Sequence, residues 1–196
     1  MDGRLNLCAS AASGILRVAV AVVFLLALPL GPCAWAFPTA AAWEHLIIQC
    51  EMGPRNPGSE GHRRCGAYIR QVLEAAGGRV SLQRFLHKAP GLPKAVELTN
   101  FLARFGPLRD GGLLLGAHWD TRPWADQDPD PRVRQDPILG ANDGASGVAL
   151  LLALAETFRE RPPEIPILMV FFDGEDLGRA NHPEEWCAGS RYYAAH

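Results

Sequence analysis

The chain has 196 residues, of which 48% are hydrophobic, and it carries a formal net charge of −2. This length suffices for one domain with a substantial hydrophobic core. The nearly balanced charge argues against a nucleic-acid partner and against an anionic membrane surface, because both recruit strongly basic chains.

The N-terminal segment is organised like a secretory signal peptide. Arg4 and Arg17 precede an apolar run over residues 18–30, and Ala34-Trp35-Ala36 follows as an A-x-A cleavage pattern. The apolar run is shorter than the roughly 20 residues that a membrane-spanning helix needs. We therefore expect a signal peptide over residues 1–36, export to the periplasm or the cell exterior, and no stable membrane association of the mature chain. An uncleaved anchor helix is the alternative.

The cysteines that lie after this segment are Cys50, Cys65 and Cys187. An oxidising compartment permits a disulfide between Cys50 and Cys65, which fall on two neighbouring predicted helices. Buried free thiols are an equally good interpretation, because one sequence does not settle cysteine pairing. The spacing does not match a zinc-finger pattern.

Helices and strands alternate along the rest of the chain, which predicts an α/β fold built as an αβα sandwich. Apolar periodicity and capping residues predict helices over residues 39–50, 60–76, 144–159 and from 189, and strands over residues 80–85, 96–105, 113–117 and 165–172. Polar loops are expected over residues 121–139 and 177–185. A loop as long as the first is usually functional or disordered, and its place between two candidate ligand segments favours a loop that borders an active site.

Acidic residues and a histidine follow the ends of two predicted buried strands. His118 and Asp120 come directly after one strand, and Glu175 and Asp176 follow another. Asp143 stands among small residues just before a predicted helix. In open α/β sheets, the carboxyl ends of strands and the N-termini of helices meet at one crevice. Imidazole and carboxylate donors gathered there indicate a zinc site, which keeps one coordination position open when it is catalytic.

Each of these residues also has a purely structural interpretation. Asp143 is a suitable helix N-cap, and the pair Glu175 and Asp176 is compatible with a solvated acidic turn. Adjacent side chains point apart, however, so one of the pair can bind a metal while the other acts as an acid or base. His118 either binds the metal while Asp120 orients it from behind, or forms a structural hydrogen bond with Asp120.

Two further residues bear on function. Trp124, in the first polar loop, either lines a pocket or anchors the loop by packing. Ser146 lacks the G-x-S-x-G context of a nucleophile elbow, which disfavours a serine hydrolase.

Taken together, these segments resemble the M28 zinc aminopeptidase and glutaminyl cyclase superfamily, and within it the bacterial-type glutaminyl-peptide cyclotransferases. The resemblance covers nearly everything after residue 36. Its segments, in order, are Gly53-Pro54-Arg55 with Pro57-Gly58-Ser59, Gly116-Ala117-His118-Trp119-Asp120-Thr121-Arg122, Ala141-Asn142-Asp143-Gly144-Ala145-Ser146-Gly147, Phe171-Phe172-Asp173-Gly174-Glu175-Asp176, and Trp186 with Gly189-Ser190-Arg191. Each of these motifs alone is moderately specific for the superfamily, but their occurrence together in this order is highly specific.

The resemblance implies a role for each candidate residue. Asp143 is implied as a zinc ligand and Glu175 as the catalytic acid/base. Asp176 is implied as the next zinc ligand, at a position where animal cyclases carry Glu. His118 matches the histidine that binds a second metal in the aminopeptidases, and its counterpart in animal cyclases is left unligated.

The activity that the resemblance implies is zinc-dependent conversion of N-terminal glutamine in peptides or proteins to pyroglutamate, with release of ammonia. Trp124 and Trp186 would then give the substrate pocket apolar cover. A zinc aminopeptidase is the alternative activity, and an inactive exported domain with an incomplete metal site is the second alternative.

The resemblance also implies a fold for residues 37–196. This catalytic domain would contain a mixed, mostly parallel sheet like that of the zinc aminopeptidases. The family supplies an acidic residue and a final histidine ligand from further downstream than His196. We therefore expect a C-terminally truncated chain with an incomplete sheet.

Overall fold

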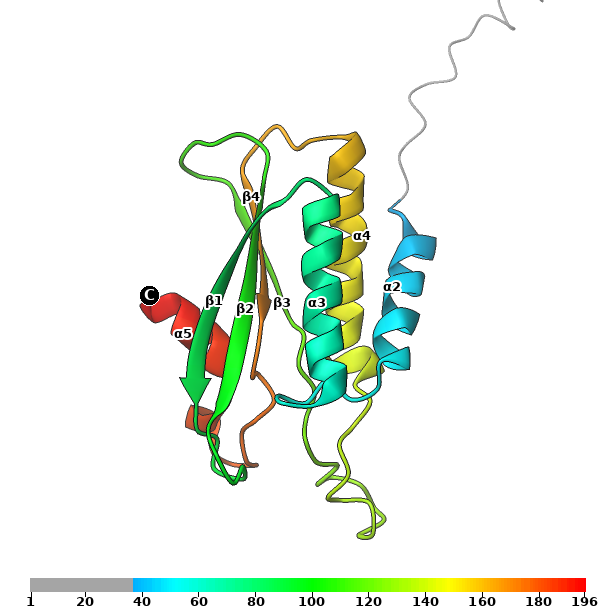
Figure 1. Cartoon of the computed structure of the whole chain (residues 1–196), viewed down its shortest axis with the longest axis vertical. Coiled ribbons are helices and arrows are strands. Elements are labelled where there is room, and N and C mark those ends of the chain that lie inside the picture. The colour runs from blue at the N-terminus through cyan, green and yellow to red at the C-terminus, as the bar shows by residue number, and fades with distance from the viewer. Residues whose placement is uncertain (1–36) are drawn as a thin grey trace, which may run out of the picture. The chain divides into compact units, whose positions relative to one another are not determined.

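The computed structural model describes residues 37–196, a four-stranded sheet with helices on both faces (Figure 1). In chain order its elements are α2 (Thr39–Glu51), α3 (Glu60–Ala75), β1 (Arg79–His87), β2 (Val96–Phe105), β3 (Leu113–His118), η1 (Ala141–Ser146), α4 (Gly147–Glu160), β4 (Ile167–Phe172), η2 (Pro183–Glu185) and α5 (Ala188–Ala195). The expected signal peptide, residues 1–36, lies outside the described residues. Within residues 37–196, no helix is both long and apolar enough to cross a lipid bilayer.

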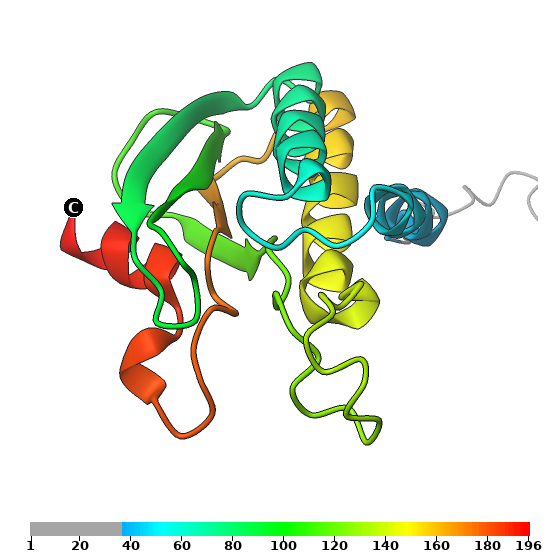
Figure 2. The same ribbon diagram turned by 60° about the horizontal axis from the view of Figure 1, so that its bottom comes forward.

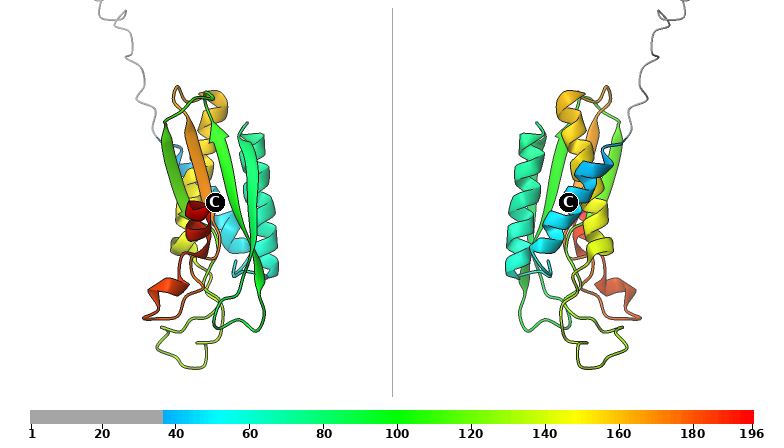
Figure 3. Two further views of the ribbon diagram at one scale, coloured as in Figure 1. Left: turned by 90° about the vertical axis from the view of Figure 1, so that its left-hand side faces the viewer. Right: turned by 90° about the vertical axis from the view of Figure 1, so that its right-hand side faces the viewer.

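Helices on the two faces of the sheet confirm the predicted αβα arrangement. The two side views of Figure 3 show α5 in front of the sheet from one side and α2, α3 and α4 from the other. On the α5 face, Tyr192 stacks on Phe85 of β1 with 4.1 Å between ring centroids. On the opposite face, Phe101 and Phe105 of β2 and Met169 of β4 are buried in the main core with α3 and α4.

The sheet is mixed, as expected, and its strand order is β1-β2-β4-β3. Among the described strands, however, the parallel pair is β3 and β4, whereas β1 pairs with β2 and β2 with β4 in antiparallel register. The connections explain the difference from a mostly parallel sheet. Residues 88–95 join β1 to β2 as a hairpin, while α4 lies between β3 and β4 and provides the long crossover that parallel strands require.

Helix α3 follows directly from its sequence pattern. The Ser59 side chain accepts a hydrogen bond from the backbone N–H of His62 at 3.0 Å, which confirms the predicted N-cap. Cys65, Ile69 and Leu73 recur at helical spacing and are fully buried in the main core. The helix therefore presents one apolar side to the sheet and its remaining side to solvent.

The cysteines among the described residues are free thiols, so the structure does not contain the alternative disulfide. Cys65 is completely buried, and burial raises the pKa of its thiol to about 12. A thiol with so high a pKa stays protonated at neutral pH and is a poor nucleophile. Cys65 is therefore a packing residue.

Two predicted boundaries matter for the site. The loop over residues 121–139 contains no helix or strand, as expected. The helix predicted from residue 144 begins instead at Gly147, because the π-helical turn η1 precedes it. Asp143 within that turn has non-helical backbone angles, φ −105° and ψ 103°, and the Asp143–Gly144 peptide bond is cis. The N-cap position of α4 is held by Ser146, so Asp143 is not the N-cap of that helix, and its side chain is free for other contacts.

Candidate active site

Three segments converge where β3 and β4 end. The two strands are parallel neighbours and pair His118 with Phe172, so the residues that follow each strand emerge at the same edge of the sheet. The turn η1 adds Asp143 through its contact with His118. Figure 2 brings this edge forward and shows the loops over residues 121–139 and 177–186 extending from it.

His118 and Asp143 are in direct contact. The Nε2 atom of His118 lies 2.8 Å from Oδ1 of Asp143, whose side chain is 63% exposed. The neighbouring Gly144 makes this approach possible, because a Cβ atom there would lie 2.7 Å from Cε1 of the His118 ring. A glycine is thus required where the turn η1 packs against the end of β3.

Asp120 is completely buried and holds the acidic pair by its backbone. Its Oδ1 and Oδ2 atoms accept hydrogen bonds from the backbone N–H groups of Glu175 and Asp176 at 3.0 and 3.1 Å. The expected contact with His118 is longer, 3.6 Å between Oδ1 and Nδ1, and is an ion-pair distance. Asp120 thus connects the end of β3 to the segment after β4.

The charge around His118 favours its protonated form. Burial lowers the pKa of the imidazole, but Asp120, Glu175 and Asp143 outweigh that effect and raise the pKa to about 9. The Oε2 atom of Glu175 lies 3.9 Å from Nδ1 of His118. A protonated His118 partly compensates the negative charge of the carboxylates in this structure.

Glu175 and Asp176 lie in different surroundings although they are adjacent. Glu175 is partly exposed, and its Oε1 accepts a hydrogen bond from the thiol of Cys187 at 3.5 Å. Asp176 is buried, and its Oδ2 has no hydrogen-bond donor among the described residues. Burial, followed by the charges of Asp120, Asp143 and Glu175, raises the pKa of the Asp176 carboxyl to about 6. The two adjacent carboxylates therefore lie in different environments.

The donor chemistry of this edge fits a divalent cation such as zinc. Asp120, Asp143 and Glu175 form ion-pair contacts with the imidazole of His118, and the charges of the same three carboxylates act on Asp176. Carboxylate oxygen and imidazole nitrogen are both zinc donors. A cation would compensate the repulsion among the carboxylates and satisfy the orphaned Oδ2 of Asp176.

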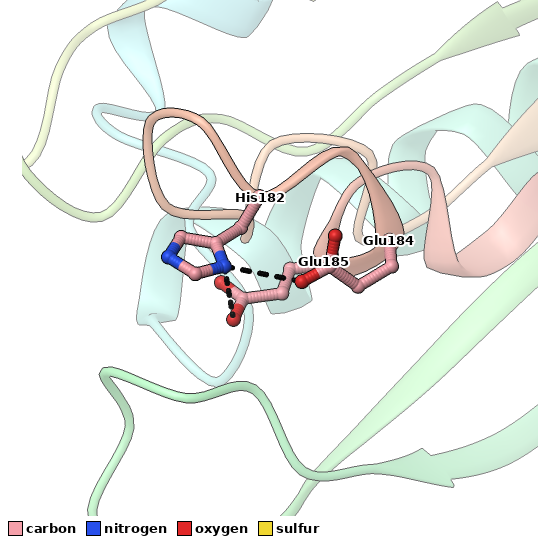
Figure 4. Close-up of side chains that lie close together, drawn as sticks. All are labelled: His182, Glu184 and Glu185. Carbon is pink, nitrogen blue, oxygen red and sulfur yellow. Dashed lines mark hydrogen bonds and ion pairs between the residues drawn. The ribbon is translucent and has the colours of Figure 1, made fainter.

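The tightest group of possible donors lies elsewhere. Among residues 37–196, the ligand atoms that all fall within 4.8 Å of one another belong to His182, Glu184 and Glu185 at η2 (Figure 4). Arg179 already forms an ion pair with Glu185, and His182 contacts both glutamates. This group is a largely exposed ion-pair network, and the predicted ligands Asp143 and Asp176 do not form a comparably tight set with a third donor.

A buried carboxylate that the sequence did not single out supports the segment after β4. Asp173 is fully buried, and its carboxylate lies 3.0 Å from Nε2 of His62 and accepts the backbone N–H of Thr99 at 2.7 Å. The backbone N–H of Asp173 donates to Oδ1 of Asn100 at 3.0 Å. The position of Asp173 directly after an apolar strand was the sequence signal for this role. Its partners could not be predicted, because they are distant in the sequence.

Arg55 is a second residue whose role was not expected. It is completely buried, and its guanidinium donates to the backbone oxygens of Leu139 and Gly140 at 2.9 and 2.8 Å and to that of Trp119 at 3.3 Å. Its backbone N–H donates to the hydroxyl of Thr121. Arg55 therefore joins the end of β3 to the start of η1, and so supports the segments that carry His118 and Asp143.

The two tryptophans proposed as pocket cover both lie close to one arginine, Arg122. The Cζ atom of Arg122 is 5.4 Å from the ring centroid of Trp124 and 4.9 Å from that of Trp186. Both rings are partly exposed. These are cation–π distances, so each tryptophan is held at the site edge by the guanidinium.

Known proteins are similar to this chain in sequence and in fold. Peptidase family M28 matches residues 100–196. A glutaminyl-peptide cyclotransferase-like protein of Bos taurus is 27% identical over 149 residues, which are 71% of this chain and 37% of that protein. The chain therefore spans less than half the length of this curated relative.

Two solved structures match more closely in sequence. The crystal structure of Tannerella forsythia glutaminyl cyclase has a TM-score of 0.78 and 36% identity, covering 82% of this chain and 56% of that one. A Zn-dependent exopeptidase from Parabacteroides distasonis has a TM-score of 0.78 and 35% identity, covering 83% of this chain and 57% of that one. One is named a cyclase and the other an exopeptidase, so similarity alone leaves the reaction open.

Proposed function

Because the chain belongs to the M28 peptidase and glutaminyl cyclase superfamily, we propose that this protein is a zinc-dependent glutaminyl-peptide cyclotransferase. Its substrates would be peptides or proteins with an N-terminal glutamine, and its products a pyroglutamyl peptide and ammonia. The observation that carries the proposal is the pair Glu175 and Asp176, which Asp120 holds by the backbone in two different environments. The relatives named as cyclases support the same reaction.

The proposed zinc ligands are Asp143 and Asp176, with His118 as a further donor or left unligated. Zinc, when bound, would polarise the side-chain carbonyl of the substrate glutamine as a Lewis acid. Catalytic zinc sites usually take three ligands from the protein. We therefore expect binding to be weak unless His118 contributes.

Glu175 is the proposed acid/base. Its Oε1 is engaged by the Cys187 thiol, while Oε2 lies at a longer distance, 3.9 Å, from His118. Oε2 would accept a proton from the substrate α-amine as the amine nitrogen bonds to the side-chain carbonyl carbon. The same oxygen would then deliver that proton to the amide nitrogen, which leaves as ammonia when its bond to carbon breaks.

Cyclisation is chiefly a problem of proximity and of water exclusion. The substrate side chain must fold back on its own amine, and a water molecule in the site would compete with that amine. Trp124 and Trp186 border the site and are the proposed apolar cover, because Arg122 holds both rings at its edge.

A zinc aminopeptidase is the second candidate. The contact between His118 and Asp143 favours this candidate, because a hydrolase that uses two metal ions would use both residues as metal ligands. An inactive exported domain is the third candidate, and it is favoured by the lack of a tight three-donor set at the predicted ligands in residues 37–196.

Product analysis separates these candidates. A Gln-initiated peptide that loses ammonia supports the cyclase, whereas release of a free N-terminal residue from a Leu-initiated peptide supports the aminopeptidase. A protein that binds no zinc and transforms neither peptide is the inactive domain. The location that accompanies this function is also a proposal, namely export after removal of residues 1–36.

A further inference from the structure

Arg122 is a buried cation at the point where the two loops of the site edge meet. Its Nε and Nη2 atoms donate to the two carboxylate oxygens of Asp126 at 2.8 and 2.6 Å. Its Nη1 atom donates to the backbone oxygens of Asp176 and Gly178 at 3.3 and 2.9 Å, and lies 3.7 Å from Oδ1 of Asp176. One side chain thus binds its own loop and the loop after β4.

Two tryptophans, one from each loop, lie against the same guanidinium. Each ring also packs on a glycine where a side chain would not fit. A Cβ atom on Gly91, in the β1–β2 hairpin, would lie 2.6 Å from the Trp124 ring, and one on Gly178 would lie 2.5 Å from Cγ of Trp186. The indole N–H of Trp186 donates to the backbone oxygen of Arg179 at 3.0 Å. The β1–β2 hairpin is therefore a third segment joined at this point.

We propose that Arg122 is a positioning residue, which joins the loop over residues 121–139 to the loop over 177–186 and thereby holds Asp176 in place as a metal ligand. The inference rests on the proposed function in treating Asp176 as that ligand. The other part of the proposal, that Arg122 couples the two loops, rests only on the contacts described above. Lysine is a poor substitute here, because its point charge has neither the bidentate fork that binds Asp126 nor the planar face that a guanidinium presents to aromatic rings.

The test compares Arg122→Ala and Arg122→Lys with a matched control in the same loop. Arg132 forms an ion pair with Asp130 but is 87% exposed, so Arg132→Ala removes a loop arginine without touching the junction. Hydrogen exchange of the full chain reports loop order, and calorimetric titration with zinc alone reports ligand geometry. Thermal melts show whether each variant is folded.

Both Arg122 variants should accelerate exchange in residues 121–139 and 177–186 together by about tenfold or more, the scale of a lost charge-assisted hydrogen bond. Zinc affinity should fall by about tenfold to a hundredfold, as when outer partners of metal ligands are removed. Arg132→Ala should change neither. If the Arg122 variants do not fold, Asp126→Asn, which weakens only the bidentate pair, should give the same two effects at smaller size.

Unchanged exchange in residues 177–186 would overturn the proposal, and so would full rescue by Arg122→Lys. Wild-type protein that binds zinc, with affinity unchanged in Arg122→Ala, would also overturn it while leaving the proposed function intact. A wild-type chain that binds no zinc would instead count against the proposed function, and coupled exchange in the two loops would then still support the role of Arg122 in joining them.

Discussion

At the scale of single residues, the candidate site depends on how one buried carboxylate is used. Asp120 directs both oxygens to the backbone of Glu175 and Asp176, and this fixes the two neighbours so that one is partly exposed and the other buried. Because their environments differ, the two similar side chains of Glu175 and Asp176 can have different chemical roles. The sequence led us to expect two roles for these adjacent carboxylates. Asp120, which holds the backbone of both, was expected instead to orient His118.

Removing the acid/base function of Glu175 should affect turnover and leave metal binding unchanged. Glu175→Gln keeps the size of the side chain but cannot accept the proton, so turnover of a Gln-initiated peptide should fall by about a hundredfold or more. Zinc content should stay at the wild-type level. Glu160→Gln, an exposed substitution at the end of α4, is the control. Equal turnover in Glu175→Gln and wild type would exclude the assigned role.

The raised pKa of Asp176 makes the metal-free protein less stable at neutral pH. Because the folded-state pKa is about 6, the folded protein binds more protons than the unfolded chain between the ordinary aspartate pKa of 3.8 and about 6. Stability therefore falls as pH rises through that window. Asp176→Asn should remove this dependence and stabilise the chelator-treated protein at neutral pH by on the order of 2 kcal/mol.

Urea unfolding at acidic and neutral pH measures this effect. The comparison variant is Asp110→Asn, which changes an exposed aspartate in the turn between β2 and β3. That variant should follow wild type at both pH values. An Asp176→Asn protein that keeps the wild-type loss of stability between the two pH values would assign the effect to another group.

At the scale of elements, the turn η1 is the part that brings the third segment to the site. Its irregular backbone turns Asp143 toward the end of β3, and Gly144 lets the two segments touch. Arg55 supports the same region by binding the backbone on both sides of it. The periodicity of the following helix could not predict this turn, because small residues are compatible with both a regular helix start and an irregular one.

Two glycines at this turn provide a matched pair of variants. A Cβ atom on Gly144 would lie 2.7 Å from the ring of His118, whereas one on Gly147 would lie 3.1 Å from Cβ of Ala117. Gly144→Ala should displace Asp143 and lower zinc affinity by about tenfold or more, with a stability loss of about 1–3 kcal/mol from overpacking. Gly147→Ala, at the first position of α4, should keep zinc affinity. Calorimetric titration with zinc compares the two, and equal affinities would refute this account of η1.

At the scale of the whole molecule, most of the fold followed from local patterns. The Ser59 cap, the buried face of α3 and the bounds of β2 were predictable because each depends on residues close in sequence. The strand directions were less predictable. Residues 88–95 contain the turn dipeptide Pro90-Gly91, but the antiparallel pairing of β2 with β4 joins segments that are remote in the chain. The contacts of Arg122 and Asp173 were not predictable, because their partners lie on segments remote in the chain.

The expected maturation of the chain remains a prediction at this scale. Arg17, the apolar run and Ala34-Trp35-Ala36 predict cleavage after residue 36. N-terminal sequencing of protein recovered from the periplasm or the medium should begin at Phe37. Protein confined to the cytoplasm with Met1 or its successor intact would contradict export.

The most direct test of the central claim is mass spectrometry of a Gln-initiated peptide incubated with the zinc-loaded protein, with a Leu-initiated peptide in parallel. We predict that the first peptide loses one ammonia without losing a residue, and that the second is unchanged. Chelation of zinc should abolish the reaction. Release of free leucine from the second peptide, with no loss of ammonia from the first, would contradict the cyclase assignment and establish the aminopeptidase.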